Sequence, residues 1–173
     1  TMFNNTSGSQ NVALGSSALY SSTSSEGNVS VGASSLYSNS TGNSNTALGS
    51  NALTSTTQGG NNVAIGYSAG RQNTTGTGNV FIGNEAGNTS SYQTASNKLV
   101  VANSDTETPL IEGDFSAKTL KINGDINVTG DIVGGNNVVE TRLIEYEFNL
   151  SNDAEVFGVT MQELLGANIN YGT

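Results

Sequence analysis

The sequence contains no cysteine, no histidine and no tryptophan, and it has a single proline among its 173 residues. These absences exclude disulfides, thiolate chemistry and imidazole ligands. Serine nucleophiles would also lack their usual base, since histidine is the side chain that most often activates a hydroxyl. No apolar run approaches the ~18–20 residues needed to cross a bilayer, and no signal peptide opens the chain. We read the chain as a piece of a longer protein and expect this piece not to insert into a membrane.

Charge is scarce and unevenly distributed. Charged residues make up 11% of the chain, and the net charge is −9. Residues 1–96 carry a net charge of −1 (Glu26 and Glu85 against Arg71), and residues 97–173 carry −8 (twelve acidic against four basic side chains). Neither part offers the basic surface that a phosphate backbone requires, so nucleic acid and anionic membranes are not expected as partners.

The residues in abundance are glycine, serine, threonine and asparagine. There are 22 glycines, and only 34% of the residues are apolar. Disordered chains have a similarly low hydrophobicity, but they are usually also enriched in proline, lysine and glutamate. Small polar residues also suit tight turns and close packing, provided that a repeat orders them.

One short motif recurs at a constant step along the chain. It reads Asn-Val-Ala-Leu-Gly from Asn11 and returns in related form from Asn28, Asn45, Asn62 and Asn79. A small residue follows three positions after each glycine, and the residue after that is leucine in the first three copies and glycine in the last two. Five copies in phase argue against a disordered linker and for a repeat fold. The repeat residues that we expect to be structural are Asn11, Gly15, Asn28, Gly32, Asn45, Gly49, Asn62, Gly66, Asn79 and Gly83.

The motif alternates in the manner of a short β-strand. Val12 and Leu14 point to one side of the strand, and Ala13 points to the other. Gly15 and its copies suit a turn or a close approach of two backbones. A second short strand over residues 17–20 and a return loop would complete each coil. Five coils stacked at ~4.8 Å predict a parallel β-roll, or solenoid.

A single roll of this kind would bury few large side chains. The first coil offers Val12, Leu14, Leu19 and Tyr20, and burying four such groups does not offset the conformational entropy lost when a whole coil is ordered. We therefore expect the alanine-bearing face to pack against other copies of the chain. This reasoning favours an oligomer without fixing the number of chains.

The motif set resembles the head repeats of trimeric autotransporter adhesins of the YadA type. The resemblance covers about residues 8–90 and rests on the Asn-Val-Ala-Leu-Gly and Asn-Val-Ala-Ile-Gly cores, each with a small residue three positions later. It implies a left-handed parallel β-roll assembled as a homotrimer. The repeat step is longer here than the family's usual coil, so larger loops are expected.

The segment after the repeats resembles the part that succeeds such repeats in phage tail fibres and tail-fibre-like bacterial surface proteins. The matching stretches are residues 97–104, 108–115 and 120–125. We expect the roll to end at residue 96 and short strands to form a neck or stalk over residues 97–136, with hairpin turns at Asn-Gly pairs such as Asn123-Gly124. Residues 137–173 then begin a further domain, interpreted as a tip, with a strand over 138–150 and helical turns over 159–165.

These features predict an all-β, homotrimeric fibre segment without enzymatic activity. We expect it outside the cell, at a cell surface or on a virion tail fibre, where it would attach to a glycan or protein of a cell surface or matrix. The alternative is a phage tail-fibre segment for host recognition. An ice-binding solenoid would need a regular threonine column, whereas threonines such as Thr74, Thr75 and Thr77 scatter in the loops. A polysaccharide depolymerase would need two neighbouring carboxylates, and Glu26 and Glu85 lie over three coils apart.

Few other residues suggest a binding site. Tyr20, Tyr37 and Tyr67 each follow a repeat glycine, and an exposed row of such rings could stack on sugars, but rim packing between coils is the favoured interpretation. Two acidic groups, around Asp105 to Asp114 and Asp125 to Asp131, lack the loop signature of a helix-loop-helix calcium site and are interpreted as solvated turns. No catalytic residue, metal or cofactor is expected.

Overall fold

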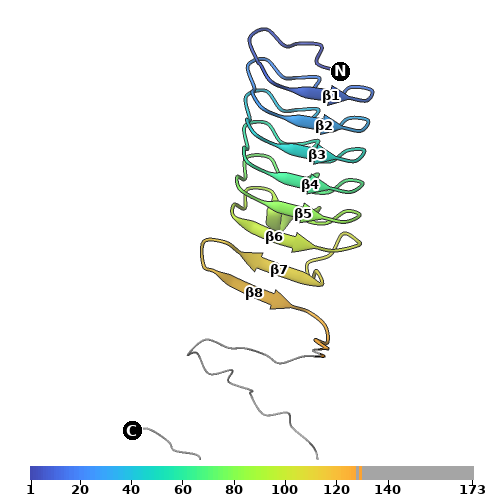
Figure 1. The fold of residues 1–173 in the computed structure, drawn as a ribbon, viewed down its shortest axis with the longest axis vertical. Coiled ribbons are helices and arrows are strands. Elements are labelled where there is room, and N and C mark those ends of the chain that lie inside the picture. The colour runs from blue at the N-terminus through green and yellow to red at the C-terminus, as the bar shows by residue number, and fades with distance from the viewer. Residues whose placement is uncertain (128, 130–173) are drawn as a thin grey trace, which may run out of the picture. The chain divides into compact units, whose positions relative to one another are not determined.

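The structure is a computed structural model that describes residues 1–127 and 129. Within these residues the fold is all-β, with eight strands in one sheet, one short 3-10 helix and no α-helix (Figure 1). The strands follow each other in the sheet in the order in which they occur in the chain. The tip domain expected over residues 137–173, with its strand and its helical turns, lies outside the described residues.

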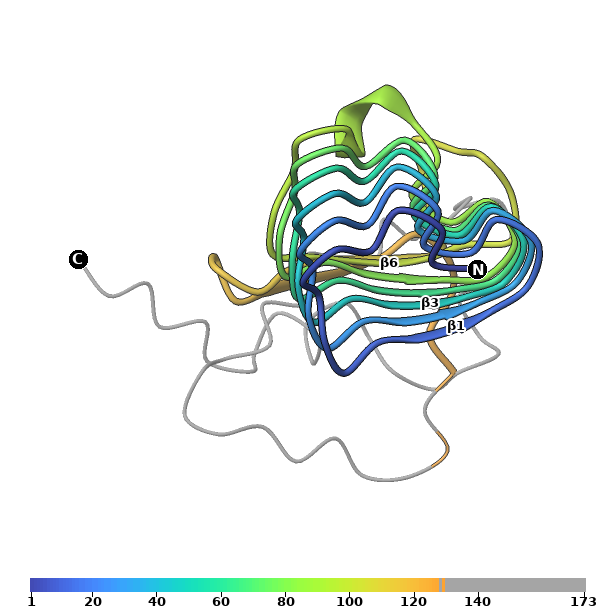
Figure 2. The ribbon, with the colours of Figure 1, turned by 90° about the horizontal axis from the view of Figure 1, so that it is seen from above.

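The repeat motif forms the first five strands, which stack in parallel and in register. Each residue pairs with its counterpart in the next copy, as Val12 does with Val29, so every copy of the motif occupies the same place in its coil. Seen along the stack, the coils follow nearly the same path (Figure 2). The predicted solenoid of about five turns is therefore confirmed. The strands are β1 (Val12–Leu14), β2 (Val29–Val31), β3 (Thr46–Leu48), β4 (Val63–Ile65) and β5 (Val80–Ile82).

The sheet continues past residue 96, where the roll is expected to end. Strand β6 (Lys98–Val101) pairs in parallel with β5, and Val80 lies opposite Leu99, so this coil is longer than those before it. The longer coil contains the 3-10 helix η1 (Ser90–Tyr92). Strands β7 (Ile111–Asp114) and β8 (Thr119–Ile122) then add an antiparallel hairpin to the same sheet.

The turn of this hairpin is closed by Asp114 and not by an Asn-Gly pair. One Asp114 carboxylate oxygen accepts hydrogen bonds from the backbone N–H groups of Ser116, at 2.8 Å, and Ala117, at 2.9 Å. The expected hairpin turn at Asn123-Gly124 is wrong, because these residues follow β8 rather than joining two described strands. A carboxylate that binds the turn's own N–H groups stabilises the turn without the Asn-Gly pair.

The wall opposite the sheet is built of turns, so the second strand expected over residues 17–20 is wrong. Ser17 and Leu19 both have left-handed backbones, with φ of 57° and 51°. Such residues bend the chain too sharply for a strand. The backbone polar groups are satisfied instead by the neighbouring coil, as when the N–H of Leu19 donates to the carbonyl of Ser35 at 3.1 Å.

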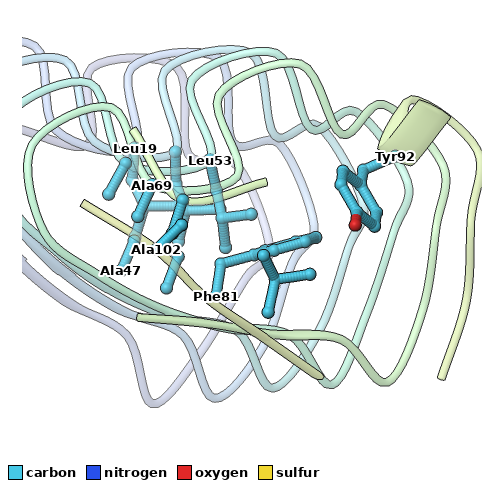
Figure 3. Close-up of a cluster of buried hydrophobic side chains, with 12 residues drawn as sticks. Leu19, Ala47, Leu53, Ala69, Phe81, Tyr92 and Ala102 are labelled. Carbon is cyan, nitrogen blue, oxygen red and sulfur yellow. The ribbon is translucent and has the colours of Figure 1, made fainter. Parts of the chain in front are cut away.

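The two faces of the sheet are oriented the opposite way from our expectation. Ala47 and Ala64 are fully buried inside the coils, whereas Val12 and Leu14 are 53% and 66% exposed. The alanine-bearing face therefore packs inward and does not face other copies of the chain. The interior is thin, and side chains from the opposite wall such as Leu53 already fill much of it (Figure 3), so small residues suit the inner face of the sheet.

In the last coils the sizes of the interior side chains are reversed, with a large residue on the sheet and glycine on the opposite wall. Phe81 occupies the inner position that Ala64 holds one coil earlier, and it is fully buried. Glycines 70 and 87 occupy the positions held by leucine in the first three coils. A Cβ built on Gly70 would lie only 2.5 Å from Cδ2 of Phe81, and one on Gly87 would meet the same ring. The change from leucine to glycine in the last two copies thus makes room for one large ring, which also packs edge-on against Tyr92.

Candidate interaction surfaces

The repeat asparagines form a column inside the solenoid. Asn45 shows the pattern: its backbone N–H donates to Oδ1 of Asn28 at 2.9 Å, and its own Oδ1 accepts from the backbone N–H of Asn62 at 3.0 Å. Its Nδ2 group donates to the carbonyl of Gly59 at 2.9 Å. Because each amide binds the coils on both sides, the column joins the stack and leaves no group free for a ligand. Those fully buried are Asn28, Asn45, Asn62 and Asn79, and Asn11 is half-buried.

The repeat glycines lie where the backbones of successive coils meet most closely. Gly32 has φ of +135°, and a Cβ placed on it would lie 2.5 Å from the carbonyl oxygen of Gly49. The same crowding occurs at Gly15, Gly49, Gly66 and Gly83. Both the conformation and the contact require glycine. The ten repeat residues therefore hold the coils together and do not form a surface site.

The three candidate tyrosines do not form one row. Tyr20 stacks between Phe3 and Tyr37, with ring centroids 5.5 and 5.2 Å apart and interplanar angles of 4°. Both faces of the Tyr20 ring are therefore covered by other rings, and a sugar ring would need a free face. Tyr67 belongs to a different position of the coil, directly after Gly66, and is 52% exposed.

The threonines, in contrast to our expectation, line up. One position of the return loop holds Thr or Ser in five successive coils: Thr6, Thr23, Ser40, Thr57 and Thr74. Their hydroxyls donate to a carbonyl one coil further on, as from Thr57 to Thr74 at 3.2 Å. The column exists, but its hydroxyl protons bind the backbone, which makes it a second ladder between the coils.

Many of the exposed large apolar side chains lie on the outer face of the sheet, and we call this surface the apolar face. It consists of two columns of outward-pointing side chains, one from each end of the three-residue strands. The first column is Val12, Val29, Thr46, Val63, Val80 and Leu99, and the second is Leu14, Val31, Leu48, Ile65, Ile82 and Val101. Strand register carries the face on through Ile111, Leu120 and Ile122 of the hairpin.

The apolar face is exposed and carries no charge along β1 to β6. Leu48, Ile65 and Ile82 are 47%, 39% and 38% exposed, and the only polar side chain in the two columns is that of Thr46. Parallel sheets are ordinarily covered on both faces, and contiguous exposed apolar surface marks interaction sites. The sequence contains this signal in its Val-x-Leu alternation, but the prediction that alanine faces other chains assigned those larger side chains to the interior.

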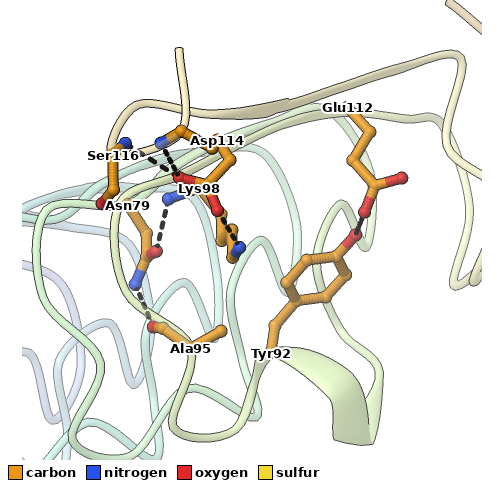
Figure 4. Close-up of polar contacts among 8 residues, drawn as sticks. Asn79, Tyr92, Ala95, Lys98, Glu112, Asp114 and Ser116 are labelled. Atoms are coloured by element: carbon orange, nitrogen blue, oxygen red, sulfur yellow. Dashed lines mark hydrogen bonds and ion pairs between the residues drawn. The ribbon is translucent and has the colours of Figure 1, made fainter. Parts of the chain in front are cut away.

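The inner face changes character where the hairpin adds to the sheet. Lys98 forms an ion pair with Asp114 at 2.5 Å (Figure 4). The hydrogen bond from Lys98, assisted by backbone N–H groups of the turn, lowers the pKa of Asp114 to about 2. Glu112 and Lys121 take the position in the sheet that Ala64, Phe81 and Val100 hold in the coils, so the inner face of the hairpin is polar.

Tyr92 connects the last coil to the hairpin. Its hydroxyl donates to a carboxylate oxygen of Glu112 at 3.2 Å, while its ring packs against Phe81. Burial, reinforced by the negative charge of Glu112, raises the pKa of Tyr92 to about 12. Two of the acidic residues interpreted as solvated turns, Glu112 and Asp114, thus form specific contacts, and Glu107 accepts a hydrogen bond from Ser91.

The two carboxylates of the repeat part lie far apart in the described chain. Glu26 lies in the return loop before β2, and Glu85 follows β5. No group of three or more potential metal ligands gathers in this part of the chain.

No described helix is long and apolar enough to span a membrane. Comparison with known protein families, with curated proteins and with solved structures gives no match.

Proposed function

We propose that this chain is a segment of a homotrimeric extracellular fibre that attaches to a glycan or protein of a cell surface or matrix. The observation that carries this proposal is the apolar face, which runs along all six parallel strands of the solenoid. Covering such a face removes apolar surface from water, and each fully buried Val, Leu or Ile side chain contributes ~1.5–3 kcal/mol.

The periodicity of the apolar face favours other copies of the chain as its cover. The face repeats once per coil, with a rise of ~4.8 Å set by strand spacing. A second copy has the same rise and can match the face along its whole length, whereas a globular partner matches it only in part. Each chain carries a net charge of −9. Because the apolar face itself is uncharged, two copies can meet there without repulsion between like charges.

The number of copies comes from the resemblance of the motif to the head repeats of trimeric autotransporter adhesins. Three chains around an axis parallel to the stack would each contribute one apolar face to a shared core. The loops and turns of each coil would remain on the outside. A target could then be bound by three equivalent surfaces at once, which raises the apparent affinity of weak contacts.

Host recognition by a phage tail fibre is the second candidate, favoured by the sequence after the repeats, which resembles the part that follows such repeats in phage tail fibres. Both candidates use the same assembled surface. The longer protein distinguishes them: a membrane-anchoring barrel indicates an adhesin, and a region that attaches to a virion indicates a phage fibre.

Binding of the assembled chain to arrays of glycans and matrix proteins tests the proposed attachment. Ile65→Asp places a charge on the apolar face and should dissociate the assembly, and Thr75→Asp in the loop of the same coil is the matched control. We expect the wild type and Thr75→Asp to bind a common set of targets and Ile65→Asp to lose at least tenfold in apparent affinity. Absence of binding by the assembled wild-type chain would contradict an attachment role for this segment.

A further inference from the structure

Thr46 interrupts the apolar face at one level. The first column holds valine in four of the five repeat coils, and Thr46 is the exception, in β3. Strand register places its side chain outward, beside those of Val29 and Val63. It also differs in its role from Thr23, Thr57 and Thr74, whose hydroxyls donate to neighbouring coils. Nothing in the construction of the coil requires a hydroxyl at this position.

A periodic interface such as the apolar face does not by itself define the axial register of the chains. If chains assemble side by side through columns that repeat every coil, a shift of one chain by one coil places valine on valine again. Most contacts of the shifted assembly are then as good as those of the aligned one. Repeating surfaces therefore need a feature that occurs once, as a single polar residue in a coiled-coil seam fixes register.

We propose that Thr46 sets the axial register of the assembly, an inference that rests on the proposed homotrimer. In the five repeat coils the first column has only valine and threonine, and such small, β-branched side chains suit a crowded axis where three chains converge. With the chains aligned, the three Thr46 hydroxyls lie at one level and satisfy one another by hydrogen bonds. A shift by one coil places each hydroxyl against valine, where it is buried without a partner.

Register can be measured because the chain contains no cysteine. The Val63→Cys chain and the Val80→Cys chain are refolded together in equal amounts, oxidised, and analysed by mass spectrometry without reduction. In aligned assemblies each introduced thiol lies level with the same position of the neighbouring chain, so disulfides join identical chains. A one-coil shift brings the position of Val63 level with that of Val80 in a neighbour, and disulfides then join unlike chains.

We expect disulfides between identical chains to predominate in the background with Thr46. In the Thr46→Val background, the share of disulfides between unlike chains should rise at least threefold. The exposed loop variant Thr75→Val should leave the share unchanged. The pair Val29→Thr with Thr46→Val, which moves the hydroxyl layer by one coil, should restore the original pattern.

Two results would overturn the inference in distinguishable ways. If the wild-type chain is an oligomer by light scattering and Thr46→Val leaves the disulfide pattern unchanged, Thr46 does not set register although the assembly stands. If the wild-type chain is a folded monomer, the proposed function fails and the register inference fails with it.

Discussion

At the scale of single residues, side-chain amides and glycines hold the coils together. An amide can donate and accept at once, so one asparagine per coil can bind both neighbouring coils and extend a ladder without limit. A glycine allows two backbones to approach more closely than any Cβ permits. These two demands explain why Asn and Gly occupy the same two positions in all five copies of the motif.

Asn45→Ala tests the amide column. The substitution removes the side-chain partner of the buried Asn62 N–H and of the Gly59 carbonyl, so we expect unfolding to be easier by about 2–4 kcal/mol. Asn43→Ala is the matched control, because Asn43 binds the exposed N–H of Glu26. Urea denaturation followed by circular dichroism measures both. Equal and small losses for the two variants would show that the column is dispensable.

Gly32→Ala tests the close approach of the backbones. Here a Cβ would lie 2.5 Å from the carbonyl oxygen of Gly49, and we expect a loss of about 2–4 kcal/mol. Gly27→Ala is the comparison, because Gly27 also has positive φ, +65°, but its Cβ would lie 3.7 Å from its nearest neighbour, Oγ of Ser44. Strain of the left-handed backbone alone costs about 1 kcal/mol. Similar thermal midpoints for the two variants would argue against crowding as the reason for glycine.

At the scale of elements, the backbone of the solenoid repeats from coil to coil while the side chains in its interior change. The first three coils combine a small residue on the sheet with leucine on the opposite wall, as in Ala47 with Leu53. The fifth coil reverses the sizes, with Phe81 on the sheet and Gly87 opposite. Such compensation preserves the thickness of the interior, which stacking in register requires.

A double substitution tests this compensation. Phe81→Ala leaves a cavity, and we expect a loss of about 3–5 kcal/mol in the free energy of unfolding. Adding Gly87→Leu recreates the filling of the earlier coils, where Leu53 has φ of 51°, close to the 66° of Gly87. The second change should recover at least a third of the loss, whereas Gly87→Leu alone should destabilise. Additive losses in the denaturation curves would show that the two positions are independent.

Tyr92 makes the attachment of the hairpin sensitive to alkaline pH. Its pKa is raised to about 12 from the ordinary value of 10, so the folded state favours the protonated form. This contribution is complete below pH 10 and is lost as the pH rises from 10 through 12. We expect the urea midpoint of the wild type to fall more steeply over that range than that of Tyr92→Phe. Parallel pH profiles for the two proteins would contradict the role of the Tyr92 hydroxyl.

The repeat determines much of this architecture in advance, but not which face of the sheet points inward. Five motifs at a constant step predict both the coils and their register. In Asn-Val-Ala-Leu-Gly both faces hold apolar residues, and only the thinness of the coil shows that Ala47 faces inward and Leu48 outward. The sequence also does not predict the left-handed turn at Leu19 or the longer coil around Tyr92, because each depends on contacts with neighbouring coils.

At the scale of the whole molecule, the described part of the chain has a covered inner side and an uncovered apolar face. The inner columns of asparagine, alanine and leucine give each coil its polar and apolar contacts with the next coil. The outer columns have no such cover along the sheet, and Val12, Leu14 and Leu48 are all about half exposed or more. A surface of this kind favours association in water, and its exposure in a lone chain favours aggregation.

Sedimentation equilibrium of the purified chain at micromolar concentration tests this association most directly. One chain has a mass of 17.7 kDa, and we expect three times that mass for the wild type and for Thr75→Asp. Ile65→Asp should sediment with the mass of one chain, because a carboxylate on the apolar face would be buried without a partner in the assembly. A wild-type chain that is well folded and remains a monomer of 17.7 kDa would contradict the assembly through the apolar face.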